Sequence, residues 1–189
     1  NYEKFINELE SLSCQSLDIR YFTGKKISDL EDILTLTMFS CLKSINIYFK
    51  YSSIINENIF INLCQKHNRV QHLFVHSSPY NKEIKSKFYN YNNIIFTKEN
   101  ITSHNHCGII DSGYFVSNIH MFTEAQHYNT CLNRKISVDI DGNIKNCPSM
   151  EKSYGSINNM TLKEALEKSG FKDIWLIKKD IIEVCKDCE

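Results

Sequence analysis

The first hundred residues alternate between two patterns of apolar positions. Apolar residues at helical spacing predict three helices, over residues 5–12, 28–38 and 56–64. Short runs of β-branched and aromatic residues predict strands at residues 17–22, 44–50, 70–76 and 93–97. The strands begin about 25 residues apart, roughly the length of a strand, a crossover helix and two loops. The pattern therefore predicts an α/β fold in which helices join parallel strands.

Local signals refine the helix starts. Ser28 precedes Glu31 by the spacing of a capping box, and Asn56 is placed to cap the next helix. Residues 77–90 are expected to form a loop and a further helix. These repeats fit a partial (β/α) barrel as well as a doubly wound sheet. The sequence has no GxxxxGK phosphate loop and no GxGxxG after a strand, so this part of the chain carries no nucleotide motif.

The character of the sequence changes after residue 100, and we expect two domains, residues 1–100 and 101–189. The second domain opens with a cluster of possible ligands: His104, His106 and Cys107. Later in this domain, Thr161 and Glu164 form a second capping box. They predict a short helix, which Gly170 is expected to end.

An antiparallel hairpin is predicted for residues 136–147. Apolar and polar residues alternate through residues 136–140, and Asp141-Gly142 is a strong signal for a two-residue turn. On this pattern Asp139 lies on the polar face of the hairpin and Asp141 lies in the turn. Turn geometry therefore explains both carboxylates better than catalysis does.

Composition excludes several classes of protein. The chain has 22 basic and 22 acidic residues, so it has no general positive field for nucleic acid or anionic lipid. No stretch is as apolar as a membrane span, and no signal sequence opens the chain. The expected location is therefore the cytoplasm, a reducing compartment in which the eight cysteines are thiols rather than disulfides.

Four cysteines have the arrangement of metal ligands. The predicted hairpin carries Cys131 and Cys147 towards a common place, and Cys185 and Cys188 have the spacing of a metal-binding pair. An iron-sulfur cluster and a structural zinc ion each take four ligands, mostly thiolates. A redox-active dithiol is the other chemistry that the final pair allows.

The remaining cysteines and histidines have simpler explanations. Three cysteines on or near apolar helical faces are expected to fill the core: Cys14, Cys41 and Cys64. Three histidines in or beside the predicted strands are expected to be packed or exposed rather than catalytic: His67, His72 and His76. Four later histidines are better placed for ligation or proton transfer: His104, His106, His120 and His127.

The cysteine pattern carries a family resemblance. Cys131, ten residues, Gly142, four residues, Cys147 and then Cys185-x-x-Cys188 resemble the SPASM domain of radical S-adenosylmethionine peptide-modifying enzymes. Three local stretches resemble more specifically the SPASM-domain peptide maturases of grasp-with-spasm systems: HNHCGIID, FTEAQHYNTCLNRKISVDIDGNIKNCPSM and YGSI. Such maturases occur beside an ATP-grasp ligase and a ribosomally made precursor peptide.

The resemblance implies a set of ligands for auxiliary four-iron, four-sulfur clusters. Cys131 and Cys147 match ligand positions of the first cluster, and Cys185 and Cys188 match ligand positions of the second. Cys107, in its His-Cys-Gly setting, is a candidate for a further ligand of the first cluster. Two more cysteines follow in the family pattern, whereas the sequence printed here stops at Glu189. The resemblance therefore predicts a module that is incomplete at its C-terminus.

Radical S-adenosylmethionine enzymes hold their catalytic cluster with C-x-x-x-C-x-x-C, and the sequence contains no such triplet. We therefore expect a maturase-like accessory protein that binds the precursor peptide and works with the ATP-grasp ligase. Its catalytic residues, if it has any, are not identified by the sequence. One alternative is a radical enzyme that binds S-adenosylmethionine through a motif upstream of Asn1. Another is an interaction module that a zinc ion stabilises through the four thiolates.

Overall fold

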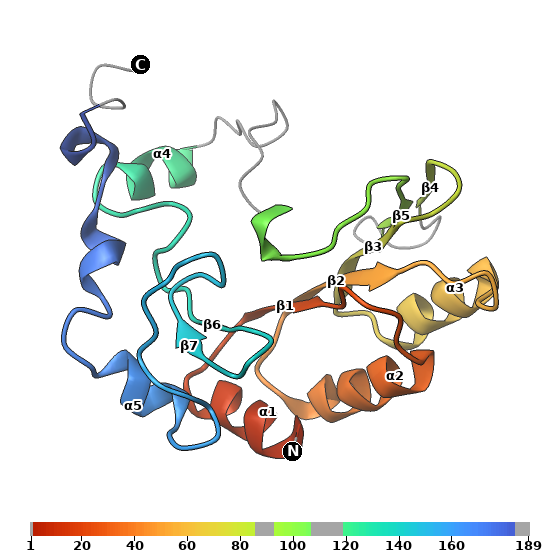
Figure 1. Ribbon diagram of the computed structural model, residues 1–189, viewed down its shortest axis with the longest axis horizontal. Helices are drawn as coiled ribbons and strands as arrows, with labels where there is room; N and C mark the ends of the chain where they lie inside the picture. Colours follow the sequence, from red (N-terminus) through yellow and green to blue (C-terminus); the bar gives the residue numbers. More distant parts are fainter. Residues whose placement is uncertain (1, 86–92, 107–118, 184–189) are drawn as a thin grey trace. The chain divides into compact units, whose positions relative to one another are not determined.

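The computed structural model describes residues 2–85, 93–106 and 119–183 (Figure 1). The chain divides into two compact units, which are treated separately: unit 1, residues 1–106, and unit 2, residues 107–189. The helices of unit 1 are α1 (Tyr2–Ser11), α2 (Ile27–Leu36), η1 (Thr37–Phe39), α3 (Glu57–Lys66) and η2 (His104–His106). Its strands are β1 (Ser16–Arg20), β2 (Ser44–Lys50), β3 (Val70–His76), β4 (Lys82–Lys85) and β5 (Asn93–Phe96).

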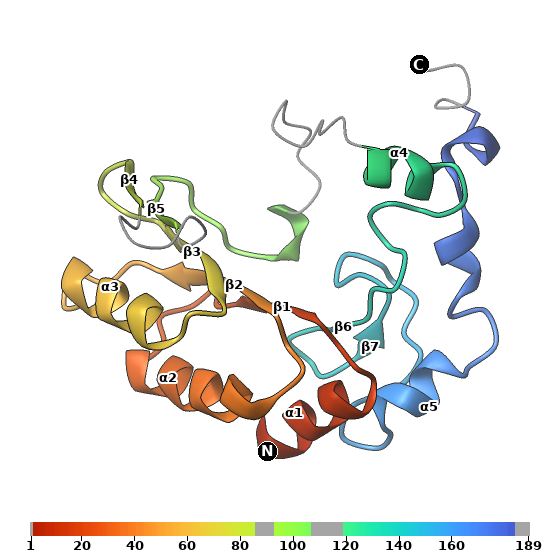
Figure 2. The same cartoon turned by 180° about the vertical axis from the view of Figure 1, so that it is seen from behind.

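Unit 1 is built on a five-stranded sheet with the order β1-β2-β3-β5-β4. Strands β1, β2, β3 and β5 are parallel, and β4 pairs antiparallel with β5. Helices α2 and α3 lie against the same face of this sheet (Figures 1 and 2). Among the described residues the strands do not close into a barrel. The mixed α/β class predicted from the apolar pattern is therefore present, with mostly parallel strands.

The core of unit 1 lies between the sheet and the two helices. Alternate residues of β2 are buried, because one face of the strand meets α2 and α3 while the other face does not. Phe60 of α3 is at the centre, where its ring makes edge contacts with Phe49 and Phe96. Such edge-to-face contacts add to the stabilisation that burial of the rings already provides.

Two local predictions for unit 1 are wrong. Residues 82–85 form the edge strand β4 rather than a helix, and residues 86–92 lie outside the described part of the chain. Helix α2 begins at Ile27, so Ser28 lies inside its first turn, and no side chain caps the helix. Ile27 packs against the core, and this contact sets the start of the helix ahead of the capping-box signal. Asn56 does cap α3, by accepting a hydrogen bond from the backbone of Asn58.

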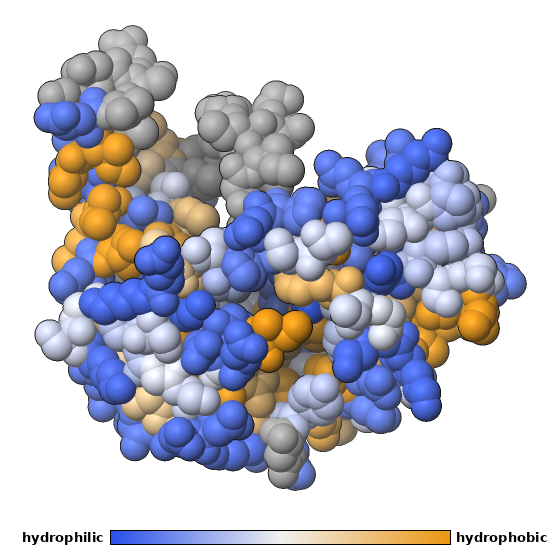
Figure 3. All heavy atoms as spheres, viewed as in Figure 1, coloured by the Kyte–Doolittle hydropathy of each residue, from blue (hydrophilic) through white to orange (hydrophobic). Residues whose placement is uncertain are grey.

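Unit 2 has little regular structure in its described residues. Its helices are α4 (Ile119–Ala125), α5 (Leu162–Leu166), η4 (Asp173–Leu176) and η5 (Lys179–Ile181), and its strands are β6 (Ser137–Val138) and β7 (Ile144–Lys145). Apolar side chains are exposed along its last described segment: Leu176, Ile177, Ile181 and Ile182 (Figure 3). No helix of the described residues, in either unit, is long and apolar enough to cross a membrane.

Candidate metal centre

A short hairpin forms the middle of unit 2. Strands β6 and β7 pair antiparallel, with Val138 opposite Ile144. The backbone of Asp139 then bonds that of Asn143, and residues 140–142 make a three-residue loop instead of the predicted two-residue turn. Gly142 has a φ of 80°, the left-handed conformation that such a loop requires of its last residue. The paired strands are therefore shorter than the alternation predicted.

The loop changes the position of two predicted side chains. Ile140, expected on an apolar face with Ile136 and Val138, is 82% exposed because it lies in the loop. Asp139, expected on the polar face, has a side chain that is only 6% exposed. Carboxylate burial and isoleucine exposure both follow from the extra loop residue, which ends the strand alternation at Val138.

The buried Asp139 carboxylate holds the loop together. It accepts hydrogen bonds from the backbone of Asp141 and from the backbone and side chain of Asn143, at 2.8–3.1 Å. Its third partner is Lys145 on β7, with 2.8 Å between the charged atoms. Burial opposes ionisation, but these hydrogen bonds outweigh it and lower the pKa of Asp139 to about 2. The role of this carboxylate is thus to order the backbone, as turn chemistry predicted.

Residues 154–157 run along the outer side of β7. Ile144 donates its backbone N–H to Gly155 and accepts from Tyr154, both at 2.8 Å, and Ile157 donates to Gly142 at 3.0 Å. Gly155 has a φ of 137°, and a Cβ at this position would lie 2.1 Å from the sulfur of Met160. The backbone conformation therefore favours glycine here, and a Cβ would also displace the side chain of Met160.

Unit 2 has a small core of its own. Its members are buried residues from several segments: Leu132, Ile144, Tyr154, Leu162, Ala165 and Phe171. Two polar side chains tie this core to the backbone: Tyr154 donates to the carbonyl of Gly170 at 2.8 Å, and Asn146 donates to that of Phe171 at 2.9 Å. Asn146 was not identified from the sequence, because no local pattern distinguishes a buried asparagine from an exposed one.

The capping box of Thr161 and Glu164 is confirmed at the start of α5. Each residue satisfies a backbone N–H of the other, as the spacing predicted. The helix ends at Leu166, with Glu167 as its C-cap, so it does not extend to Gly170. Gly170 has a φ of 82° and belongs to the turn that leads to Phe171. The prediction of its helix-ending role was therefore wrong by one turn.

Two of the predicted ligands, Cys131 and Cys147, lie in the described part of unit 2, and both have free thiols. Cys131 precedes β6 and is exposed, in a turn where Asn129 accepts hydrogen bonds from the backbone of Cys131 and of Leu132. Cys147 follows β7 and is 9% exposed. Because β6 and β7 are antiparallel, Cys147 follows the hairpin at the end opposite its loop, the same end at which the chain from Cys131 enters β6 after a turn at residues 130–134.

The other three predicted ligands, Cys107, Cys185 and Cys188, lie outside the described residues. Within the described ranges, no group of three or more histidine, cysteine or acidic side chains is arranged to hold a metal ion. The described residues thus include two of the five cysteines that are predicted to be ligands. The two are not joined in a disulfide, and soft thiolate donors are the ligands that iron-sulfur clusters and zinc prefer. As thiolate donors, Cys131 and Cys147 suit an iron-sulfur cluster and a zinc ion equally well.

The cysteines of unit 1 lie elsewhere and differ in burial. Cys64 is buried in the core, and burial raises the pKa of its thiol to about 12. Cys14 and Cys41 are only half-buried, so the prediction that they fill the core is wrong for these two residues. Each thiol instead donates to a backbone carbonyl, Cys14 to Ser16 at 3.2 Å and Cys41 to Cys14 at 2.9 Å.

The histidines also differ in burial. His67 and His76 are buried, and His72 is partly buried, so all three are packed in unit 1. The ring of His76 bonds the carbonyl of Tyr21 at 2.9 Å and the hydroxyl of Ser77 at 3.1 Å. The four later histidines are half-buried or exposed: His104, His106, His120 and His127.

Comparison with known proteins adds one finding to this geometry. Residues 130–189 match the SPASM iron-sulfur cluster-binding domain. The match includes the hairpin, α5 and four of the five predicted ligands, all except Cys107. No curated protein and no solved structure matches the chain. A SPASM iron-sulfur cluster-binding domain is therefore detected in the C-terminal third of the chain, and the resemblance to grasp-with-spasm maturases stays a prediction.

Proposed function

We propose that unit 2 binds auxiliary four-iron, four-sulfur clusters and that the protein is an accessory component of peptide maturation. In this proposal Cys131, Cys147 and Cys107 serve the first cluster, and Cys185 and Cys188 serve the second. The protein binds a ribosomally made precursor peptide and works with an ATP-grasp ligase. The observation that carries the proposal is the SPASM match over residues 130–189.

The local structure around the described thiols supports the cluster part of the proposal. The carboxylate of Asp139 fixes the loop, and hydrogen bonds to residues 154–157 fix β7. Hydrogen bonds within the chain therefore hold the backbone of the loop and of β7, the strand that Cys147 follows. A cluster would supply an electron-transfer or structural centre there, whereas the chain's own residues set where the thiols stand.

Anaerobic reconstitution tests the cluster assignment. Wild-type protein should bind iron and sulfide in a near one-to-one ratio and turn brown, and Cys147→Ser should lose much of both. Cys14→Ser is the matched control, because Cys14 is a half-buried thiol in unit 1 and should leave the iron content unchanged. Protein that binds zinc but no iron or sulfide would replace the cluster assignment with a zinc-stabilised module.

A second experiment tests the maturation role separately. The reconstituted protein should bind a precursor peptide encoded beside it, and should be retained by the neighbouring ATP-grasp ligase. A scrambled peptide of the same composition is the control. If iron and sulfide bind but neither peptide nor ligase does, the cluster assignment holds and the role in peptide maturation is wrong.

A further inference from the structure

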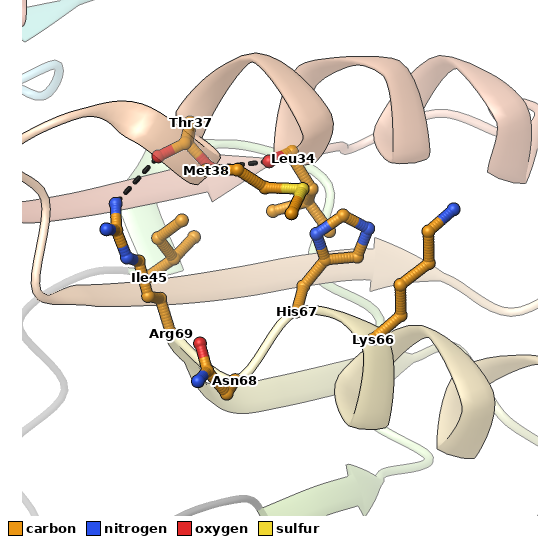
Figure 4. Close-up of a pocket in the computed structure, with 8 residues that line it drawn as sticks. All are labelled: Leu34, Thr37, Met38, Ile45, Lys66, His67, Asn68 and Arg69. Carbon is orange, nitrogen blue, oxygen red and sulfur yellow. Dashed lines mark hydrogen bonds between the residues drawn. The ribbon is translucent and has the colours of Figure 1, made fainter.

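A pocket of about 280 Å³ lies in unit 1, between the end of α2, the start of β2 and the segment that joins α3 to β3 (Figure 4). Five of its eight lining residues are polar: Thr37, Lys66, His67, Asn68 and Arg69. Arg69 donates to the carbonyls of Thr37 and Ser40 at 2.7 and 2.8 Å, and Lys66 forms an ion pair with Glu31. These contacts join α2 and η1 to the chain around the end of α3, so the two cationic side chains of the lining support the fold.

In unit 2, Cys147 is tied to residues 171–175 through the residue before it. Asn146 is 2% exposed, and its side-chain NH₂ group donates to the carbonyl of Phe171 at 2.9 Å. Phe171 is itself buried, and its ring contacts the ring of Trp175, with 6.0 Å between the ring centres. The backbone that leads into Cys147 therefore has a fixed partner outside its own hairpin.

Cys131 is tied to the same segment through Asn129. The backbone N–H of Asn129 donates to the carbonyl of Trp175 at 2.8 Å. The side-chain oxygen of Asn129 accepts hydrogen bonds from the backbone N–H groups of Cys131 and Leu132, at 3.1 and 3.0 Å. Leu132 is buried whereas Cys131 is exposed. These contacts therefore hold a turn that places one side chain in the core and leaves the neighbouring thiol accessible.

We propose that Asn129 and Asn146 are positioning residues for the first cluster, and that residues 171–175 are their common anchor. The segment fixes where Cys131 and Cys147 stand relative to each other, because it bonds the chain next to each of them. Contacts that orient metal ligands typically contribute about 10- to 100-fold in metal affinity. The inference deepens the proposed function and rests on it, since it needs both thiolates to serve one cluster.

The two asparagines use opposite ends of their amide groups. Both side-chain partners of Asn129 are N–H groups, so this residue must supply an acceptor. The partner of Asn146 is a carbonyl, so this residue must supply a donor. An aspartate retains the acceptor and lacks the donor. Replacement by aspartate should therefore be tolerated at residue 129 and not at residue 146.

The whole protein, anaerobically reconstituted with iron and sulfide, tests this assignment. Asn129→Ala should release part of its iron to a chelator roughly tenfold or more faster than wild type, with a changed visible circular dichroism spectrum. Asn129→Asp should restore both the rate and the spectrum. If wild type and Asn129→Ala both hold iron and agree in rate and spectrum, the inference is wrong and the proposed function stands. A wild type that holds no iron overturns both.

Tyr154→Phe separates positioning from general stability. Tyr154 donates to the carbonyl of Gly170 at 2.8 Å in the same unit, but it adjoins neither cysteine in the sequence. Its replacement should lower the stability of metal-free unit 2, followed by Trp175 fluorescence, and leave the rate of iron release at the wild-type value. If Tyr154→Phe speeds iron release as much as Asn129→Ala, lost stability explains both results and the inference is wrong.

Asn146→Asp extends the test to the second asparagine. This variant keeps the size of the side chain but places a carboxylate against the carbonyl of Phe171. It should lose much of the iron of the first cluster, whereas Asn129→Asp should not. Wild-type iron retention by Asn146→Asp would show that the bond to Phe171 does not position Cys147, and would overturn the inference.

Discussion

The two units of the chain are held together by different means. In unit 1, helices α2 and α3 and four parallel strands bury a continuous apolar core that includes Phe49, Phe60 and Phe96. In unit 2, the described strands are two residues long, and side chains bonded to the backbone do much of the ordering. A unit with so small a core usually needs another constraint, such as a metal centre.

This difference has a consequence for stability. Unit 1 should fold on hydrophobic burial alone, whereas unit 2 should depend on the proposed cluster and on a few backbone contacts. The chain offers a separate reporter for each unit. Its only tryptophan, Trp175, lies in unit 2, so its fluorescence follows that unit. The longer helices lie in unit 1, so far-ultraviolet circular dichroism follows mainly that unit.

Removing a cluster ligand should have the largest effect. We expect Cys147→Ser in reconstituted protein to lower the unfolding free energy of unit 2 by several kcal/mol, because free energy of metal binding is also free energy of folding. Trp175 fluorescence should report the loss, and the circular dichroism transition should barely move. The contrasting variant, Cys64→Ala, removes a buried thiol of unit 1 and should do the reverse. Equal sensitivity of both transitions to both variants would contradict the comparison.

A backbone substitution should come next. Gly155→Ala forces a Cβ onto a residue with a φ of 137° and against the sulfur of Met160. We expect a loss of about 2–3 kcal/mol from unit 2, combining backbone strain with a displaced side chain. Gly24→Ala in unit 1 is the control, since nothing lies within 4 Å of the added Cβ. Denaturant unfolding followed by Trp175 fluorescence measures Gly155→Ala, and circular dichroism measures Gly24→Ala. A neutral Gly155→Ala would show that residues 154–157 can move freely.

The carboxylate that orders the hairpin loop predicts a pH dependence. The pKa of Asp139 is about 2 in the folded chain, below the value of roughly 3.9 for an unfolded aspartate. The folded state therefore favours the ionised form, and its contribution is complete above the unfolded pKa and lost as the pH falls towards 2. That contribution is about 2 kcal/mol at neutral pH.

Replacing the carboxylate of Asp139 tests the direction of this pH dependence. Asp139→Asn should destabilise unit 2 at pH 7, and its difference from wild type should shrink as the pH falls from about 5 to 2. Lys145→Met should behave alike, because it removes the partner of the same ion pair. Asp141→Asn is the control, since this exposed loop residue contributes only its backbone N–H to the network. A constant difference between Asp139→Asn and wild type across this pH range would exclude the titration of Asp139 as its cause.

The sequence predicted the long strands of the sheet better than it predicted the short edge strand and the hairpin loop. Strands β2 and β3 fall on the predicted residues because each is a run of β-branched and aromatic side chains. Strand β4 was predicted as helix, because its four residues, KEIK, carry no β pattern and pair only through contact with β5. The hairpin loop was mispredicted because Asp141-Gly142 fits a two-residue turn as well as the end of a three-residue one.

The candidate site was predictable to the extent that its residues recur in a fixed pattern. The spacing of Cys131, Gly142 and Cys147 identified the SPASM domain that the comparison detects. The supports around that pattern were not predictable, because Asn146 and Lys145 act through residues brought together only by folding. The pocket beside His67 was missed for the same reason, since its lining comes from three separate segments.

Substitutions at the helix caps should have the smallest effects on stability. Among the described residues, each unit has one helix with a side-chain N-cap, so the same substitution can be compared in both units. Asn56 caps α3 in unit 1 and Thr161 caps α5 in unit 2, each by accepting a backbone hydrogen bond. Replacing either with alanine should cost about 1 kcal/mol. Asn56→Ala should move only the circular dichroism transition, and Thr161→Ala only the Trp175 transition.

Ser28 supplies the control for this pair. It has the spacing of a capping box with Glu31, but it lies inside the first turn of α2 and caps nothing. Ser28→Ala should therefore be neutral or slightly stabilising, because alanine has the higher helix propensity. A loss as large as that of Asn56→Ala would mean that α2 begins two residues later in solution, at Asp29, with Ser28 as its cap. In that case the packing of Ile27 would not set the start of the helix.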